Sequence, residues 1–564
     1  MSAAAGDGLR KSAKTTAMLM LCALMVDAKG VTESMKVKRL GALAALIACI
    51  LLLAQLTLAS ADEKTLNIAL GKEPDNLNPM SGSGHGETYD MIKVYSGLLR
   101  SDEKMHMVPD LAESWETSAD GKTYTFHLKQ GVKWHDGKDF SAEDVLFTYD
   151  LLRSGDWIAV FPTSSDYGSI EEVTIVDPTT VKFTLNEGIV SFLERFSAAI
   201  LPKHILEGQD LSKTDFWQKP IGTGPYKFDS WTQGEKLIFV INPEYYGDKP
   251  KIDLLRFVFA PEETSRIGLL KSGEVDAIKI DPRSIKTLEN ANGIRVYSMP
   301  SANWYALKLP NNVWPFDDKK VRQAISCAIN KQLILDTVFN GQGEIAYGPY
   351  RSQDWVYNPD IAFPYDTKKA ELLLAEAGFK EGSDGVLEKD GKKLEFELYY
   401  PSSETERKDI AIVAKTDLEE IGIKVEPVGK SWDELTQNFT MTHAIVNAFG
   451  SPFDPDDTNF RLWDSKFIGK KNGNPTSYSN SEVDALLEAG RTTFDQEQRK
   501  QDYQKVQTII AEDQPMVFLV FCNYIYAVSD KITGIVPRNA PHGQGINGGI
   551  SGEIWWNAEQ WQKE

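Results

Sequence analysis

The sequence predicts an α/β fold built from lobes with mixed sheets. Short apolar-patterned strands and amphipathic helices alternate along the chain, and strand–helix–strand alternation is typical of α/β domains. The 564 residues are also too many for one hydrophobic core, so two or three domains are expected. No low-complexity linker and no repeat of fixed period separates them.

The part of the chain that begins near residue 65 is predicted to consist mainly of strands and turns. Residues 65–70, TLNIAL, alternate as an opening strand. Asp120-Gly121 precedes one alternating segment and Asp136-Gly137 follows another, and both dipeptides are typical of hairpins. Ser141, with Asp144 three residues later, predicts a helix that starts with a shortened capping box.

Later segments predict helices with clear ends. Residues 317–331, DDKKVRQAISCAINK, have the pattern of an amphipathic helix. Its inward face consists of Val321, Ala324, Ile325, Ala328 and Ile329. Asp366 is predicted to cap a second helix that ends at Gly378. A third helix, over 410–421, is broken by Gly422, and the strand IKVEPV follows it.

Two further glycine-containing turns are expected. Residues 386–400 are predicted to form a hairpin about Asp390-Gly391. Gly222 and Gly224 lie two residues apart in IGTGPY, which is a weak phosphate-loop signal. No GxxxxGK[ST] run accompanies them, so a tight turn is the favoured interpretation.

The N-terminal residues, 1–61, are predicted to be a leader. Residues 36–61 have a basic start, an apolar run and a small-residue exit, which is the layout of a secretory signal peptide cleaved after Ala61. A membrane anchor is the alternative, because the run is near bilayer-spanning length. Residues 1–34 are interpreted as an over-called extension, with Met35 as the true start. The mature chain is therefore expected to be periplasmic or otherwise extracytoplasmic.

Composition and motifs exclude several classes of function. The formal net charge of −20 repels nucleic-acid phosphates, so no nucleic-acid partner is expected. No GxSxG elbow or catalytic His/Cys/Asp spacing is present, so an enzyme is not expected, and neither a cofactor nor a resident metal is predicted. Cys327 and Cys522 lie in apolar runs, which leaves buried thiols and a single disulfide as alternatives.

A set of longer motifs runs in order along residues 65–535. The longest is LAESWETSADGKTYTFHLKQGVKWHDGKDFSAEDV at 111–145. The others are EPDNLNP at 73–79, PIGTGPYKFDSW at 220–231, NPEYYG at 242–247, KSGEVDAI at 271–278, PFDDKKVRQAISCAINK at 315–331, KAELLLAEAGF at 369–379 and DPDDTNF at 454–460. Together they resemble the family 5 extracellular solute-binding proteins, which are the peptide/nickel receptors of ABC importers.

The resemblance implies a bilobed, periplasmic-binding-protein-like fold with mixed sheets, two crossing hinge strands and a cleft between the lobes. It also implies an extra subdomain inside lobe one. By that analogy the parts are 62–85, 200–295 and 515–564 for lobe one, 86–199 for the extra subdomain, and 296–514 for lobe two. The hinge crossings are expected near Tyr297 and near Pro515-Met516.

The resemblance further implies how such a receptor works. A ligand that contacts both lobes in the closed form shifts the population toward closure, and a membrane permease recognises that closed shape. No bond is made or broken. The expected partners are a small-molecule or peptide ligand and ABC permease subunits, and a monomer is expected. A ligand-binding sensory protein with the same fold is the alternative function.

The ligand is left open between a short peptide and a nickel or other metal chelate. In peptide-binding members, an Asp three residues before the Asp-Pro-Asp motif pairs with the ligand's α-amino group. This chain has Ser451 at that position, so Asp454 is considered as a substitute. The run GSPFDP at 450–455 is instead similar to the nickel-chelate branch of the family.

The predicted ligand-binding residues are Ser83, His85, Asn303, Trp304, Tyr305, Phe449, Ser451 and Asp454. Each also has a structural interpretation. His85 is either a surface-loop residue or a metal ligand if the solute is a chelate, and Trp304 is either a pocket or a core residue. Asp454, Asp456 and Asp457 are interpreted as a capped turn, because they lack the spacing of an EF-hand calcium loop.

Overall fold

The computed structural model of the chain describes residues 64–80, 93–157, 160, 167–436, 442–450, 454–470, 473–540 and 553–564. The expected leader lies outside the described residues. So do three of the predicted ligand-binding residues, Ser83, His85 and Ser451. Those expectations therefore stay predictions.

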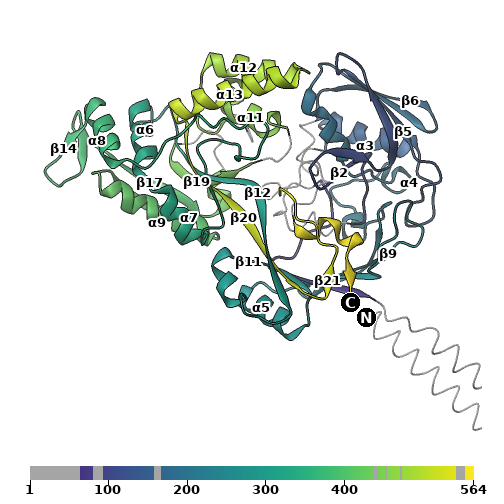
Figure 1. Cartoon of the computed structure of the whole chain (residues 1–564). Helices are drawn as coiled ribbons and strands as arrows, with labels where there is room; N and C mark the ends of the chain where they lie inside the picture. The colour runs from purple at the N-terminus through teal and green to yellow at the C-terminus, as the bar shows by residue number, and fades with distance from the viewer. Residues whose placement is uncertain are drawn as a thin grey trace, which may run out of the picture. The chain divides into compact units, whose positions relative to one another are not determined.

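An 11-stranded sheet runs through the described chain (Figure 1). In spatial order its strands are β18 (Lys424–Lys430), β17 (Glu395–Pro401), β19 (Ala444–Phe449), β12 (Ile294–Lys308), β20 (Met516–Ser529), β11 (Ala277–Ile280), β1 (Thr65–Leu70), β10 (Leu254–Phe259), β9 (Lys236–Ile241) and β8 (Tyr226–Thr232), with β13 (Gly343–Ile345) paired to β20. Parallel pairs such as β1–β10 and β17–β18 occur beside antiparallel pairs such as β12–β20. The sheet is therefore mixed, as the sequence predicts.

Two groups of buried side chains pack on this sheet. The first core draws on β1, β9, β10 and β11 and on the ends of the two long strands, with Met299 of β12 and Tyr526 of β20 among its members. The second core contains the opposite ends of the same strands and has a part on each face of the sheet, with Leu307 and Val517 on one face and Trp304 and Phe518 on the other. Because β12 and β20 pair antiparallel along most of their length, this strand pair belongs to both cores and joins them.

The chain changes from the second core to the first at a later point of β20 than the sequence suggested. The predicted crossing was Pro515-Met516, but the strand from Met516 to Cys522 packs in the second core. Ile525 is where β20 joins the first core and starts to pair with β11. Strand β20 is buried except at Asn523, Tyr524 and Ser529, and the half-buried Asn523 and Tyr524 lie where the strand passes from the second core to the first. The other domain boundaries stay predictions.

A smaller sheet and several short elements complete the first core. The four-stranded sheet consists, in spatial order, of β4 (Ala112–Thr117), β5 (Thr123–Leu128), β7 (Thr180–Leu185) and β6 (Ile170–Asp177). The other elements are β2 (Leu99–Ser101), β3 (Met107–Pro109), η3 (Val190–Ser197), α4 (Lys203–Leu206), η4 (Asp215–Gln218), α5 (Glu263–Ser272), η5 (Pro282–Thr287), β21 (Ile532–Thr533), η8 (Ile554–Gln560) and β22 (Gln562–Lys563). The predicted turns are present, with left-handed backbone at Gly121 (φ 66°) and Gly137 (φ 87°).

Helix α3 (Ala142–Ser154) begins where the sequence predicts it. Ser141 and Asp144 form the capping box, with the Asp144 carboxylate accepting the N–H of Ser141 at 3.0 Å. The same carboxylate also accepts the N–H of Lys203 at 3.0 Å and the indole N–H of Trp134 at 3.3 Å. One buried side chain thus caps the helix and holds two neighbouring segments against it.

Helices surround the second core on both faces of its sheet. They are α6 (Lys319–Ala328), α7 (Lys331–Val338), α8 (Thr367–Glu376), α9 (Thr405–Glu419), α10 (Trp432–Thr436), α11 (Asp456–Trp463), α12 (Ser481–Thr492) and α13 (Gln496–Asp513), with η6 (Ser465–Phe467) and the small sheet β14 (Lys380–Glu381), β15 (Leu387–Lys389), β16 (Lys392–Lys393). Helices α6 to α9 pack on one face of the sheet and α11 to α13 on the other, as Figure 1 shows.

Most of the predicted helix limits hold, with one exception. The expected inward face of the first helix is fully buried, and Asp366 caps α8 by accepting the N–H of Lys369. However, the segment 317–331 is not one helix. Helix α6 ends at Ala328, and α7 starts a new helix after Asn330, whose side chain accepts the N–H of Leu333. The break follows from this cap, because a capping residue cannot also continue the preceding helix.

The weaker signals of the sequence also have clear outcomes. A Cβ added to Gly222 would lie 2.0 Å from the carbonyl oxygen of Val94, so this segment is a tight turn packed on backbone. Cys327 and Cys522 are both free thiols and both buried. Within the described ranges, no helix combines the length and apolar character needed to cross a bilayer.

We predict that Asp144→Ala lowers the free energy of unfolding by about 2–3 kcal/mol, because it removes a helix cap and leaves the N–H groups of Ser141 and Lys203 without their acceptor. Urea unfolding followed by circular dichroism measures the change. Asp144→Asn, which keeps one acceptor oxygen, should recover part of the loss. Equal stability of Asp144→Ala and the natural chain would contradict the role assigned to this carboxylate.

Candidate functional site

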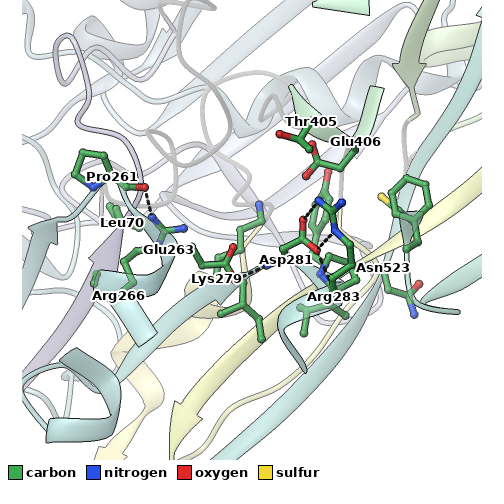
Figure 2. Close-up of a pocket in the computed structure, with 18 of the residues that line it drawn as sticks. Leu70, Pro261, Glu263, Arg266, Lys279, Asp281, Arg283, Thr405, Glu406 and Asn523 are labelled. Carbon is green, nitrogen blue, oxygen red and sulfur yellow. Dashed lines mark hydrogen bonds and ion pairs between the residues drawn. The ribbon is translucent and has the colours of Figure 1, made fainter. Parts of the chain in front are cut away.

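A cavity of about 570 Å³ lies where the two cores meet (Figure 2). The first core lines it with residues at the carboxyl ends of three strands: Gly71 after β1, Pro261 after β10 and Asp281 after β11. The second core contributes Thr405 and other residues that follow β17, and β20 lines the cavity with the segment 522–525. Crevices at the carboxyl ends of strands are the usual ligand sites of open α/β sheets, and this volume suits a small ligand.

One arginine of the cavity links the two cores. Arg283, which follows β11, binds Asp281 through two nitrogen–oxygen pairs at 2.9 and 2.8 Å. Its remaining terminal nitrogen donates to Asp409 of α9 at 2.8 Å. Close by, the side-chain amide of Asn340 donates to the carbonyl oxygen of Pro282 at 3.3 Å. The wall of the cavity is therefore held by polar contacts between the first and second cores.

The other basic residues of the cavity are also paired within the chain. The ammonium group of Lys279 lies 2.6 Å from the carboxylate of Glu553 and 4.2 Å from the ring centre of Tyr524. Arg266 donates to the carbonyl oxygens of two residues that follow β10. Glu263, an acidic residue of the lining, accepts the N–H of Asp281 at 3.1 Å.

Glu406, in the first turn of α9, brings a further carboxylate to this cavity. Burial raises the pKa of Glu406, and the nearby carboxylates of Asp281 and Glu404 raise it further. Its own backbone N–H and the guanidinium of Arg283 lower the pKa. The side chain therefore lies in a poorly solvated place among other acids.

Three predicted ligand-binding residues lie at or near the crossing strands. Tyr305 lines the cavity, and Cys522 lies on the same wall. Asn303 is buried, with its amide nitrogen 3.2 Å from the sulfur of Cys522. Trp304 points to the opposite face of β12 and is only 1% exposed, packed against Phe518 at 4.8 Å between ring centres. The structure thus places Trp304 in the second core.

Phe449 lies at the carboxyl end of β19, opposite Trp304 in the sheet. The two ring centres are 5.2 Å apart, and the ammonium group of Lys308 lies 5.3 Å from the Phe449 ring centre. Gly450 follows it, and a Cβ there would lie 1.8 Å from the carbonyl oxygen of Ala302. Phe449 therefore belongs partly to the packing of the sheet, next to the crossing point of the chain.

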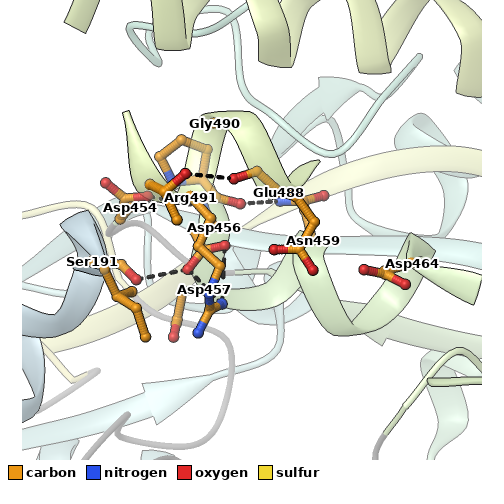
Figure 3. Close-up of polar contacts among 12 residues, drawn as sticks. Ser191, Asp454, Asp456, Asp457, Asn459, Asp464, Glu488, Gly490 and Arg491 are labelled. Atoms are coloured by element: carbon orange, nitrogen blue, oxygen red, sulfur yellow. Dashed lines mark hydrogen bonds and ion pairs between the residues drawn. The ribbon is translucent and has the colours of Figure 1, made fainter. Parts of the chain in front are cut away.

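A second contact between the cores is a group of acids and arginines, named here the acid–arginine junction. It comprises Glu194, Arg195, Asp454, Asp456, Asp457, Arg491 and Arg499. Arg195 of η3 forms an ion pair with Asp457 of α11, and Ser191 donates to Asp456 at 2.7 Å. Figure 3 shows Ser191 and Arg491 directed at the Asp456 carboxylate from opposite elements. The junction joins η3 of the first core to α11 and α12 of the second.

Asp454 has its charge compensated inside this junction. Arg499 binds its two carboxylate oxygens at 2.8 and 2.5 Å, and the N–H of Asp456 donates to the same group at 2.9 Å. The backbone N–H of Asp454 in turn donates to Glu194 at 2.9 Å. The turn interpretation of this aspartate cluster therefore describes the geometry well, and capture of a ligand amine by Asp454 stays a prediction.

Comparison with known proteins identifies the family. A model of the bacterial extracellular solute-binding proteins, family 5 (middle region), matches residues 106–470. The chain belongs to this family. Protein XP55 of Streptomyces lividans is 33% identical over 472 residues, covering 84% of this chain and 86% of the relative. The oligopeptide-binding protein AppA of Bacillus subtilis is 33% identical over 476 residues, covering 82% and 87%.

Solved structures of relatives agree in fold. NikZ from Campylobacter jejuni in complex with Ni(L-His) aligns with a TM-score of 0.77 at 32% identity, over 89% of this chain and 100% of the other. AppA from Bacillus subtilis in complex with a nonapeptide aligns with a TM-score of 0.75 at 31% identity, over 89% and 99%. The predicted family, the bilobed fold and the class of solute-binding receptor for ABC import are thereby confirmed.

The sequence analysis missed most of the residues that line the cavity of this receptor. Lys279, Asp281 and Arg283 surround the end of a short strand, AIKI, and Glu406 begins a helix after another strand. The position of charged residues directly after predicted parallel strands was the signal that could have found them. In the part of the chain that the structure describes, no group of three or more His, Cys, Asp or Glu is arranged to hold a metal ion.

We predict that Asp456→Asn changes how stability depends on pH. Burial raises the pKa of Asp456 to about 6, above the value of about 4 in an unfolded chain. A group whose pKa is higher in the folded state stabilises the fold below pH ~4 and loses that contribution as the pH rises through ~6. The variant should lack this downward step, which is on the order of 2–3 kcal/mol.

Urea unfolding of both proteins at several pH values between about 4 and 8 measures the step, which lies in the range where the two pKa values differ. The curves should converge in slope above pH ~7, where the group is ionised in both states. Parallel curves over the whole range would show that Asp456 does not titrate with the raised pKa.

Proposed function

We propose that the receptor captures a short peptide between its two lobes and delivers it to the permease of an ABC importer. The observation that carries the proposal is the cavity at the crossing strands, which both cores line. Support for the ligand class comes from relatives named as an oligopeptide-binding protein in Bacillus subtilis and a dipeptide-binding protein in Escherichia coli. We further propose that the receptor is not an enzyme and acts on its ligand without chemistry.

Capture follows from the way the two lobes share the cavity. A ligand in it would contact residues of both lobes at once, and those contacts exist only when the lobes are together. The ion pairs Arg283–Asp409 and Arg195–Asp457 also join the lobes, so closure gains contacts within the protein as well. A ligand therefore shifts an opening equilibrium rather than reacting, and the closed form is the one that the permease recognises.

The predicted organisation of the precursor is part of this proposal. The signal peptide, 36–61, is cleaved after Ala61, and the mature receptor is a periplasmic or extracytoplasmic monomer. Its parts are lobe one (62–85, 200–295 and the chain from 525 to 564, in place of the predicted start at 515), the extra subdomain (86–199) and lobe two (296–514 with the first part of β20). The separate sheet β4–β5–β7–β6 supports the extra subdomain as a unit. A sensory role would use the same fold, and loss of uptake in a deletion strain separates import from sensing.

We predict that the receptor purified from its native host releases peptides when it is unfolded, and that refolded receptor binds those peptides with a 1:1 stoichiometry. Mass spectrometry of the released material and isothermal titration calorimetry measure the two parts. Small-angle X-ray scattering should show a decrease in radius of gyration on binding, because the ligand favours closure. Release of non-peptide material alone, together with no heat of binding for any peptide, would refute a peptide ligand.

A metal chelate is the second candidate. It is favoured by the similarity to NikZ, which was solved with Ni(L-His), and by the sequence GSPFDP at 450–455. In this case the predicted residue His85 would be a metal ligand. Nickel analysis of the purified receptor and titration with Ni²⁺ plus L-histidine test it. Tight binding of that mixture, with no binding of L-histidine alone, would favour the chelate over the peptide.

A further inference from the structure

The charges that line the cavity are not all paired with other described residues. Of the residues that the structure describes, six charged side chains line it, namely Glu263, Arg266, Lys279, Asp281, Arg283 and Glu406. The first five each have a partner: two carbonyl oxygens for Arg266, Glu553 for Lys279, the Asp281–Arg283 pair, and the N–H of Asp281 for Glu263. Among the described contacts, the Glu406 carboxylate has no ion pair and no side-chain hydrogen bond. A ligand can therefore pair with it.

The surroundings of Glu406 favour a positive partner. Arg283, the cation of the lining that acts on Glu406, already has two carboxylates, Asp281 and Asp409, as partners. The carboxylates of Asp281 and Glu404 lie close enough to Glu406 to raise its pKa. A poorly solvated carboxylate among other carboxylates is costly to keep ionised, and a cation brought into the same space relieves both the desolvation and the repulsion.

The same cavity offers apolar surface for the stem of a basic side chain. Tyr305 and Phe339 line it from the second core, with ring centres 5.1 Å apart, and Ile280 lines it from the first. The aliphatic part of a lysine or arginine side chain can pack on such rings while its charged end reaches an acid. In Figure 2, Glu406 and Thr405 lie on one side of the cavity and Asp281 faces them.

We propose that Glu406 binds a cationic group of the solute, a primary ammonium or a guanidinium, so that the receptor prefers peptides with a basic side chain. This inference rests on the proposed function, in which a peptide occupies the cavity. It adds that the preferred peptide carries a basic side chain. The negative net charge of the whole chain acts in the same direction, since it attracts cationic solutes.

The test compares tripeptides that differ in one charged group. Isothermal titration calorimetry at neutral pH is run with Ala-Lys-Ala, Ala-Arg-Ala and Ala-norleucine-Ala, in which norleucine keeps the lysine stem without its ammonium. All three share the terminal charges, so any difference reports the side chain. We expect the two basic peptides to bind at least about tenfold more tightly than the norleucine peptide.

Two variants locate the effect. Glu406→Gln should reduce the preference for the basic peptides to less than about threefold, because the amide is neutral and nearly the same size. Glu420→Gln removes the same charge from the exposed far end of α9 and should leave the preference unchanged. Thermal unfolding of both variants checks the fold. If Glu406→Gln does not fold, Glu406→Asp replaces it and should keep the preference with weaker binding.

The outcomes separate this inference from the proposed function. Tight binding of all three peptides without a preference, or a preference that survives in Glu406→Gln, overturns the inference and leaves the peptide function standing. If no peptide binds, titration with agmatine tests whether the cavity binds a cation at all. Agmatine carries an ammonium and a guanidinium. Agmatine binding that Glu406→Gln abolishes supports the cation site and refutes the peptide ligand. No binding of agmatine in that case overturns the inference as well.

Discussion

The antiparallel pair of β12 and β20 is the constraint on which the rest of the structure depends. Both strands are buried along most of their length and belong to both hydrophobic cores. Because they pair with β11 at one end and with β19 at the other, they bring the carboxyl ends of strands from both lobes to the same place. This arrangement creates the cavity. Because both lobes line it, its shape depends on how closely the lobes approach each other.

Among the described residues, ion pairs join the two lobes at two places. Arg283 with Asp409 lies on the side of α9, and the acid–arginine junction lies on the side of α11. Arg283 and Asp409 stay partly exposed, whereas Arg195 and Asp457 are largely removed from water, which is favourable only when the partners fit well. Glu406 differs, because the proposed partner of its carboxylate is a cationic group of the ligand. A receptor that keeps one wall charge uncompensated gains specificity for solutes that supply the missing charge.

The predicted ligand-binding residues have different positions in the structure. Tyr305 lies in the wall of the cavity, whereas Trp304, its neighbour in the chain, points to the opposite face and packs in the core. Neighbouring side chains of a strand point to opposite faces of the sheet. Which of the two faces lines the cavity depends on the segments that pack against the sheet. Asp454 was selected from a family pattern, and its partner Arg499 comes from a helix 45 residues later in the chain. No local pattern could reveal that pairing.

By itself the sequence determined the α/β class, the family and most local structure, because caps, turns and apolar periodicity act over a few residues. The capping box of Ser141 and Asp144 and the turns at Gly121 and Gly137 are of this kind. The tertiary structure decided where β20 passes from one core to the other, which acids meet which arginines, and which carboxylate of the cavity lacks an ion pair among the described residues. Those features depend on segments far apart in the chain. The burial of a side chain and the charges around it are fixed only when all of these segments have packed together.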